Sequence, residues 1–268
     1  MIDRDALLRA IATNPDDDTP RLMYADLMDE LGGDANAARA RFIRVQIDLA
    51  RNAKTNWFAN ADRLCEVSYL AGQYADKWLD ELPIWAAEEA RKQRLRADDL
   101  PRGFLDTFHI HIPTFCKYGH HLLEVAPVTR LVVPGPLTHR DLSAVLLCPH
   151  LPFLGRVRSL VLDARGGEAD VSALYAKNSH ILGAIEELTV ASAGLTDAGA
   201  KSLSEAIGLN NLRVLVARAS QLTESGAASL LRAPLLPKLT SLDIRGAANG
   251  YQWAQRLRRG FPKKTVLV

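Results

Sequence analysis

The residues with the most reactive side chains gather in one short segment of the chain. His109 and His111 form a His-x-His pair, and Cys116, His120 and His121 follow it. Zinc prefers imidazole and thiolate ligands, and its sites need three or four of them converging on one point. The pair would point to one face of a strand, whereas Cys116 and His120 fall in a following helix-like stretch. We therefore expect no metal and no cofactor, although an enzyme or metal protein built on His109 and His111 stays open as an alternative.

Other patterns that carry chemistry are absent from the sequence or have a structural explanation. The chain has no Gly-x-Ser-x-Gly elbow for a nucleophilic serine and no glycine-rich phosphate-binding loop. The run Asp16-Asp17-Asp18 precedes a predicted helix, whose dipole such carboxylates stabilise, and no calcium-loop spacing of oxygen donors follows it. We therefore expect no enzyme activity.

Composition bounds the broad class of protein. The chain is 48% hydrophobic and 24% charged, as in an ordinary globular protein, and no apolar run approaches the ~20 residues that cross a bilayer. The N-terminal segment lacks the apolar stretch of a secretory signal. The three cysteines are too widely spaced to indicate a disulfide scaffold. These features predict a cytoplasmic protein that does not contact membranes.

Charge is distributed unevenly along the chain. Residues 1–100 carry a net charge of −5 and residues 101–268 a net charge of +7, which indicates two domains. The basic segments 91–96 and 256–264 could contact phosphates, but no aromatic residues interleave with them to stack on bases. We expect no nucleic-acid partner, and keep a nucleic-acid-associated protein that uses the basic C-terminal half as the alternative function.

Residues 1–100 predict a bundle of about four helices. Apolar residues recur at helical spacing over residues 3–14, 19–31, 34–51 and 60–80. Thr19-Pro20 is a start signal, with the threonine as N-cap and the proline at the first helical position, and Gly32-Gly33 ends that helix. The inner face of the second helix is expected to carry Met23, Leu27, Met28 and Leu31.

The first fifty residues resemble the bacterial repeat-companion domain, a short module found N-terminal to repeats. The positions that match are Leu7, Leu8, Ile11, Asn14, Pro15, Asp16, Asp17, Asp18, Pro20, Arg21, Tyr24, Ala25, Asp26, Glu30, Phe42, Ile43 and Gln46. The chain departs from the family at Leu27, where a tryptophan is usual, and carries extra residues between Gly32 and Phe42. The resemblance implies no activity; it implies that repeats follow, often leucine-rich ones.

Repeats do follow. The pattern Leu-x-x-Leu-x-Leu, with any aliphatic residue at the three positions, occurs at 105–110, 128–133, 157–162, 185–190, 212–217 and 239–244. The central positions of the last five are 29, 28, 27 and 27 residues apart, and segments 195–207 and 222–234 are near copies. This spacing resembles ribonuclease-inhibitor-type leucine-rich repeats, each a strand and a helix that bury their apolar faces against the neighbouring unit.

The turn after each strand departs from that family. An asparagine usually stands there, and stacked asparagine amides then satisfy backbone groups along the repeats. The corresponding residues here are Pro136, Arg165, Ala193, Ser220 and Ala247. We therefore expect a less regular solenoid without an asparagine ladder, and a last strand or cap from the C-terminal segment 261–268.

The strand positions also predict a binding surface. The residue between the last two apolar positions of each pattern points out of the concave sheet, and three of these six residues are valine. An exposed apolar stripe rimmed by charge often marks a contact surface, although valine also simply favours strands. The predicted protein-binding residues are His109, Val132, Val161, Asp163, Thr189, Val216, Arg218, Asp243 and Arg245.

Together these patterns predict an α/β protein with two domains. A helical repeat-companion domain over residues 1–100 is followed by a short leucine-rich-repeat solenoid with a curved parallel sheet over residues 101–268. The predicted function is a non-enzymatic scaffold that binds a protein or peptide on the concave repeat face. The valines would bury against that partner, and the charged residues would set its orientation.

Overall fold

A computed structural model of the chain gives its architecture. It describes residues 3–52, 60–93, 95–135, 155–163, 183–191, 196–205, 209–218, 222–232, 238–245, 259 and 265–267. The chain divides into two compact units, Met1–His109 with Tyr118–Thr129, and Ile110–Lys117 with Arg130–Val268. The first unit extends beyond residue 100, where the sequence analysis placed the boundary. Phe104 packs edge-on against Tyr24, and Phe108 packs edge-on against Trp85, so this segment is part of the first core.

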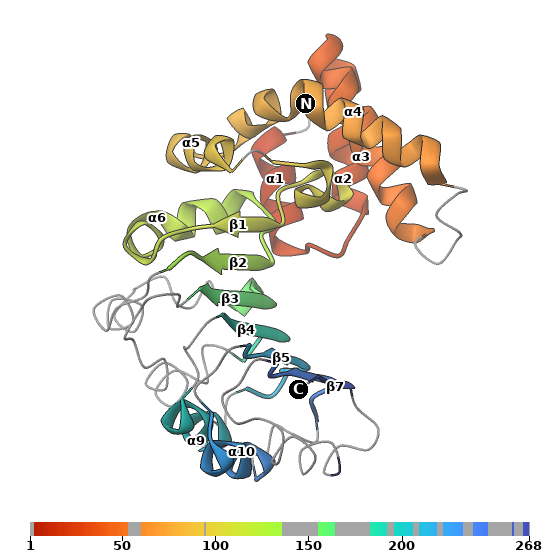
Figure 1. The fold of residues 1–268 in the computed structure, drawn as a ribbon. Helices are drawn as coiled ribbons and strands as arrows, with labels where there is room; N and C mark the ends of the chain where they lie inside the picture. The colour runs from red at the N-terminus through yellow and green to blue at the C-terminus, as the bar shows by residue number, and fades with distance from the viewer. Residues whose placement is uncertain are drawn as a thin grey trace. The chain divides into compact units, whose positions relative to one another are not determined.

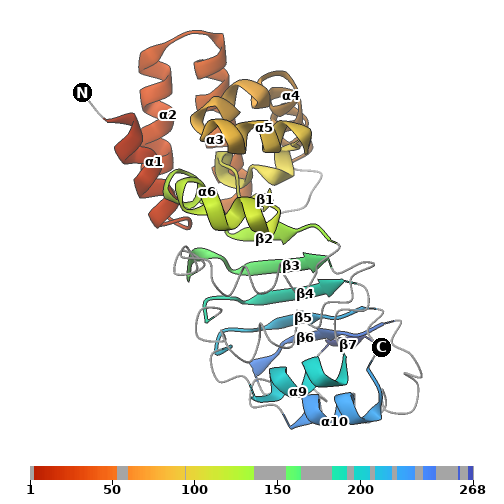
Figure 2. The same ribbon diagram turned by 90° about the vertical axis from the view of Figure 1, so that its left-hand side faces the viewer.

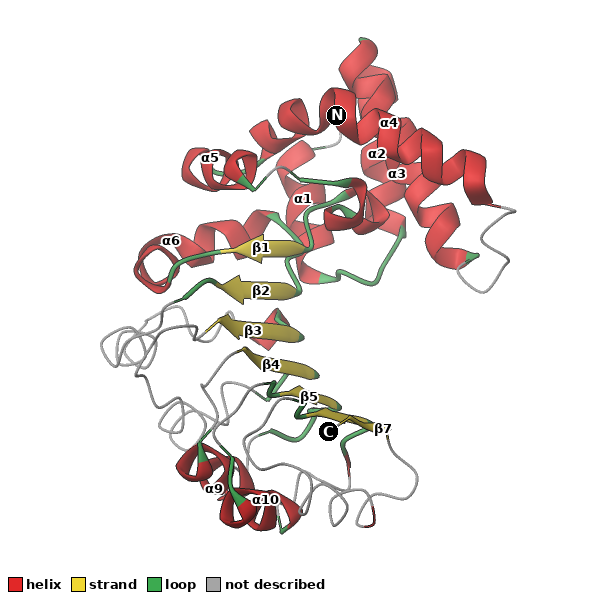
Figure 3. Ribbon diagram, viewed as in Figure 1, coloured by secondary structure: helices red, strands yellow, loops and turns green. Residues whose placement is uncertain are grey.

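The first unit is mainly helical (Figures 1 and 3). The four predicted helices are confirmed to within a few residues, and a further helix, α5, follows them. The elements are α1 (Arg4–Thr13), α2 (Thr19–Leu31), α3 (Asp34–Arg51), α4 (Ala61–Trp78), η2 (Leu79–Glu81), α5 (Ile84–Lys92), η3 (Ala97–Asp99), η4 (Pro101–Gly103) and β1 (Thr107–His109). The division between the units runs through α6 (Ile112–Val125).

The inner face of α2 differs from the expectation. Leu27 and Met28 are buried as predicted, but Met23 and Leu31 are 42% and 59% exposed. Tyr24 and Arg21 are buried in their place, and Tyr24 belongs to the core formed by α1, α2, α3 and Phe104. The spacing of aliphatic residues along α2 does not predict this arrangement. The buried side of the helix includes a tyrosine and also an arginine, and hydrophobicity alone places an arginine in solvent.

The start of α2 also differs in detail. The helix begins at Thr19, one residue earlier than predicted, so Thr19 is not its N-cap. The Asp17 carboxylate accepts a hydrogen bond from the Thr19 backbone N–H at 2.8 Å. Asp18 forms ion pairs with Arg51 and Arg102 at 3.0 and 3.8 Å. The acidic run therefore initiates the helix and ties it to two later segments.

The second unit contains a parallel sheet whose strands pair in chain order (Figure 1). The strands are β2 (Arg130–Val133), β3 (Ser159–Asp163), β4 (Glu187–Ala191), β5 (Val214–Val216), β6 (Ser241–Asp243) and β7 (Thr265–Leu267). The described helices here are α9 (Asp197–Glu205) and α10 (Glu224–Leu231), which lie side by side (Figure 2). The expected last strand in the C-terminal segment is confirmed as β7.

The register of this sheet follows the sequence pattern. The central leucines of the pattern pair with one another across neighbouring strands, and the last of them pairs with Val266. The row is Leu131, Leu160, Leu188, Leu215, Leu242 and Val266. All five leucines are buried, so they and the residues two positions later form the apolar face of the sheet.

Backbone hydrogen bonds repeat along the sheet in the same way. The Arg158 carbonyl accepts from the N–H groups of Glu186 and Glu187, at 2.7 and 2.9 Å. The carbonyls of Glu186 and Arg213 each accept two N–H groups from the next strand in the same manner. The positions where asparagines were expected to be missing, Pro136, Arg165, Ala193, Ser220 and Ala247, lie outside the described residues. Within the described part of the chain, no helix is long and apolar enough to cross a membrane.

Candidate protein-binding face of the sheet

Five of the predicted binding residues form one row across the sheet, on the face opposite the leucines. Each is the Cα partner of the next along strands β2 to β6, and the row is Val132, Val161, Thr189, Val216 and Asp243. Neighbouring strands lie about 4.8 Å apart, so the side chains are adjacent. The first four are half-buried, whereas the leucine that directly precedes each of them in the sequence is buried. We name these first four residues the outer row.

A second set of polar residues lies two positions earlier on the same face, and sequence reasoning missed it. Arg130 Nη1 donates to Glu187 Oε2 at 3.0 Å, and Ser159 Oγ donates to the same oxygen at 3.1 Å. Ser159 is the register partner of both Arg130 and Glu187, so the contact crosses three strands. The period-2 alternation that identified the outer row predicts this set as well, one step toward the strand starts.

At the other end of β5 and β6, the predicted residues Arg218, Asp243 and Arg245 form a cluster. We name the two arginines, together with the carboxylate that holds them, the arginine pair. Asp243 Oδ2 accepts from Arg218 Nε at 2.6 Å and from Arg245 Nη2 at 2.8 Å. Arg245 Nε donates to Oδ1 at 3.0 Å, so Arg245 binds the carboxylate through two nitrogens. The Asp243 side chain is only 4% exposed, whereas those of Arg218 and Arg245 are 58% and 50% exposed.

This burial corrects the expectation for Asp243. We expected its carboxylate at an exposed rim, and the structure places it beneath two guanidinium groups. The hydrogen bonds from Arg245 and Arg218 hold the pKa of Asp243 well below its usual range, and the same contact with Asp243 raises the pKa of Arg245. The carboxylate therefore remains ionised at neutral pH and holds both arginines in place.

The other two predicted residues, His109 and Asp163, lie at the ends of β1 and β3. His109 ends β1 in the first unit; it is exposed, and its backbone N–H and carbonyl bond to the Gln93 side chain at 3.3 and 3.0 Å. Asp163 ends β3, where its Cα pairs with that of Ala191. Its side chain lies outside the described residues, so the face is argued from the outer row and the arginine pair.

The structure also bears on the alternative sites. Among the described residues, no group of three or more His, Cys, Asp or Glu side chains could hold a metal ion. In the basic segment 91–96, Arg91 pairs with Asp80, and Lys92 pairs with Glu89. The second basic segment, 256–264, lies outside the described residues except for Arg259, which is exposed.

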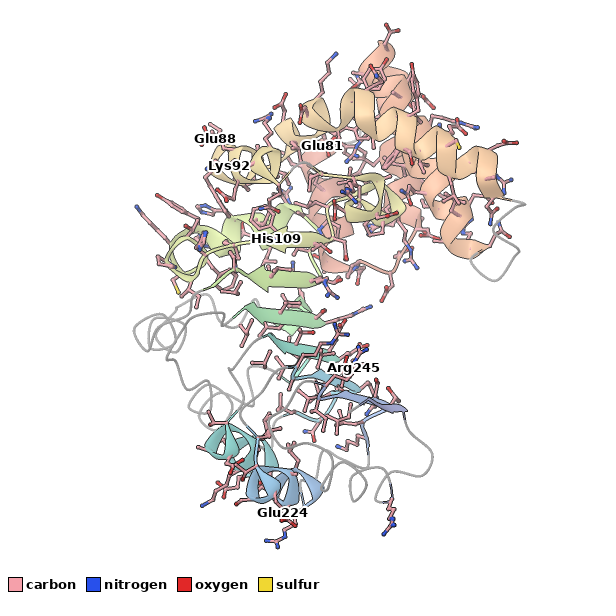
Figure 4. All side chains as sticks on the ribbon, in the orientation of Figure 1. Glu81, Glu88, Lys92, His109, Glu224 and Arg245 are labelled. Carbon is pink, nitrogen blue, oxygen red and sulfur yellow. The ribbon has the colours of Figure 1, made fainter. Side chains whose placement is uncertain are left out.

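The first unit contains a buried ion pair that sequence reasoning also missed. Arg39 Nη2 donates to Glu81 Oε2 at 3.0 Å, and these side chains are 4% and 9% exposed. The guanidinium carbon lies 4.9 Å from the Trp78 ring centre and 4.8 Å from that of Phe104. Figure 4 labels Glu81 within this unit. The available signal was helical spacing, because Arg39 precedes Phe42 by three residues on α3 and so shares its buried face.

This ion pair has the character of a structural element. A cavity of about 20 Å³ is lined by Arg39, Glu81, Trp78 and Phe104 among others. Arg39 Nε and Nη1 have no hydrogen-bond partner among the described residues, and the two rings stabilise the cation instead. The contact joins α3, α4 and η2 rather than presenting charge at the surface.

Comparison with known proteins adds no assignment: the chain matches no protein-family model and no curated protein sequence. Its function is therefore argued from the sheet face itself.

Proposed function

We propose that this chain is a non-enzymatic module that binds a protein or peptide on the outer row and the charged residues beside it. In this proposal the second unit is a short leucine-rich-repeat solenoid, and the first is a helical repeat-companion bundle. The parallel strands, the in-register leucines and the recurring carbonyl contacts support the repeat interpretation. The sequence resemblance implies a bacterial protein, and we propose that it is a cytoplasmic scaffold.

One observation carries the functional part of the proposal. Three valines and a threonine occupy adjacent strands on the face opposite the buried leucines, and all four are only half-buried. Valine alternating with buried leucine leaves apolar side chains on both faces of the sheet, and those of the outer row stay partly exposed. A contiguous apolar stripe with charged residues beside it is a surface that a partner can cover.

The charges beside the stripe suit a protein partner better than a nucleic acid. Arg130 is engaged by Glu187, and the two arginines beside Asp243 share one carboxylate. Binding to a phosphate backbone needs several cations that are not neutralised by the protein. The nucleic-acid alternative therefore depends on the basic C-terminal segment and gains no support from this face.

The test replaces the apolar stripe without changing its shape. In a Val132→Thr/Val161→Thr/Val216→Thr variant, the β-branched shape remains, but each hydroxyl would have to be buried by the partner, at a cost of about 1–3 kcal/mol without a hydrogen bond. A matched control, Leu31→Thr/Tyr69→Thr/Ile84→Thr, makes equally polar three residues of the first unit that are 59%, 66% and 80% exposed.

Each tagged protein, with its fold verified by circular dichroism, would be used to purify partners from its native cells for mass spectrometry. We expect partners that are recovered by the original chain and by the control, and at least about tenfold less by the valine variant. Equal recovery by all three proteins would remove the outer row from the binding surface. Recovery of nucleic acid instead of protein, lost at high salt, would favour the alternative function.

A further inference from the structure

The arginine pair is built to present donors rather than to neutralise charge. Asp243 uses both carboxylate oxygens on Arg218 and Arg245, and it is itself buried. The two guanidinium groups stay half-exposed above it. Figure 4 labels Arg245, which follows β6. The anion thus holds two long, otherwise flexible side chains side by side, which lowers the entropy that a ligand must overcome to order them.

Several donors of the pair remain available. Arg218 contacts Asp243 through Nε, and its Nη1 and Nη2 have no hydrogen-bond partner among the described residues. Arg245 contacts Asp243 through Nε and Nη2, and its Nη1 likewise has no such partner among the described residues. Two guanidinium groups and one carboxylate leave a net charge of +1. That charge does not vary near neutral pH, because arginine remains protonated and Asp243 remains ionised.

The pair adjoins the outer row directly. Val216 is the register partner of Asp243, and Arg218 follows Val216 by two residues. The Ala217 N–H donates to the Asp243 carbonyl at 2.7 Å, so the two strands stay paired just beyond Val216. A ligand group on the arginines would therefore lie next to an apolar surface.

Resting on the proposed function, we infer that Arg218 and Arg245 together bind one carboxylate of the partner, so that the partner is a peptide segment with an Asp or Glu beside apolar residues. A carboxylate carries one negative charge and accepts the parallel N–H bonds that a guanidinium presents. It therefore matches the net charge of +1, whereas a phosphate with nearly two negative charges would leave an excess. The apolar neighbours of the acid would cover Val216 and Thr189.

The test begins with selection of phage-displayed random peptides on the intact chain. We expect the enriched peptides to share an Asp or Glu adjoining apolar residues. One such peptide, labelled with a fluorophore, would then be titrated by anisotropy with the original chain and with Arg218→Gln. This variant leaves Asp243 bound by Arg245, so the fold is preserved. Arg232→Gln, an exposed arginine that follows α10, is the matched control.

A double-mutant cycle isolates the contact. Arg218→Gln and replacement of the peptide acid by its amide should each weaken binding about tenfold, and the two together should weaken it little further. Arg232→Gln should leave the affinity unchanged. Additive losses, or enriched peptides without an acid, would overturn the carboxylate assignment while leaving peptide binding intact. Tighter binding of a peptide with phosphoserine in place of the acid would overturn it in favour of a phosphate.

The same selection separates this inference from the proposed function. If no peptide is enriched, or if enriched peptides bind the Val132→Thr/Val161→Thr/Val216→Thr variant as tightly as the original chain, then the face itself is not a binding surface. The inference about Arg218 and Arg245 would then fall with it.

Discussion

The two units bury opposite charges for different purposes. In the first unit, Arg39 is the buried cation, and both it and Glu81 are less than a tenth exposed. In the second unit, Asp243 is the buried anion, and its two arginines remain about half-exposed. The fold thus encloses both Arg39 and Glu81. In the arginine pair it encloses only the carboxylate, and the two guanidinium groups that contact it remain about half-exposed. A buried ion supports a binding role when its partners face solvent with donors that form no hydrogen bond to a described residue, as the two arginines beside Asp243 do.

The largest effect is expected from breaking the enclosed pair. Arg39→Met keeps the length of the side chain, but it leaves the buried Glu81 with Arg4, 3.7 Å away, as its one cationic partner among the described residues. Removing one partner of a buried pair typically costs 3–5 kcal/mol, and we expect about 3 kcal/mol of unfolding free energy because Arg4 remains. Urea unfolding followed by circular dichroism measures the loss.

The control for that substitution lies on the same helix. Arg41 pairs with Glu66 at 2.6 Å, but their side chains are 60% and 31% exposed, so Arg41→Met should cost less than about 1 kcal/mol. Equal losses for the two variants would mean that burial does not distinguish these pairs.

An intermediate effect is expected in the second unit, where α9 and α10 are joined. The Asp197 carboxylate accepts the Thr223 backbone N–H at 2.8 Å, and Thr223 is the N-cap of α10. Asp197→Ala removes this contact and should lower the unfolding free energy by about 1–2 kcal/mol. Asp197→Asn keeps an acceptor oxygen and should lose less. If the alanine and asparagine variants were equally stable, the carboxylate contact would not link α9 to α10.

The smallest effect is a dependence of stability on pH at the open cluster. The pKa of Asp243 is lower in the folded chain than the value of about 3.9 in an unfolded one, so its pairing stabilises the fold fully above about pH 5. This contribution is lost as the pH falls below about 4, because the unfolded chain then takes up a proton first.

The measurement compares the urea midpoints of the original chain and Asp243→Asn between pH 7 and pH 3. Asparagine keeps one acceptor oxygen for the arginines, so we expect the original chain to be more stable by only about 0.5–1 kcal/mol near neutral pH, and the difference to shrink in acid. A constant difference over the whole range would show that ionisation of Asp243 does not contribute.

The sequence by itself determined the local elements and the register of the sheet. Aliphatic residues at the first, fourth and sixth positions of a recurring six-residue pattern predict six strands, and the structure has strands at all six positions. Helical periodicity likewise located four helices of the first unit. These features are local or repeat at a fixed spacing, so the pattern of apolar residues along the chain specifies them.

The tertiary structure alone decided which charged residues are buried and which partners they meet. Arg39 and Glu81 are 42 residues apart, and Arg218 and Asp243 are 25 apart, so no local pattern relates either pair. Hydropathy by itself favours solvent exposure for Arg21, Arg39 and Asp243, and the fold buries all three. A buried charge is stable only with a compensating partner, and that partner exists only once distant segments have been brought together.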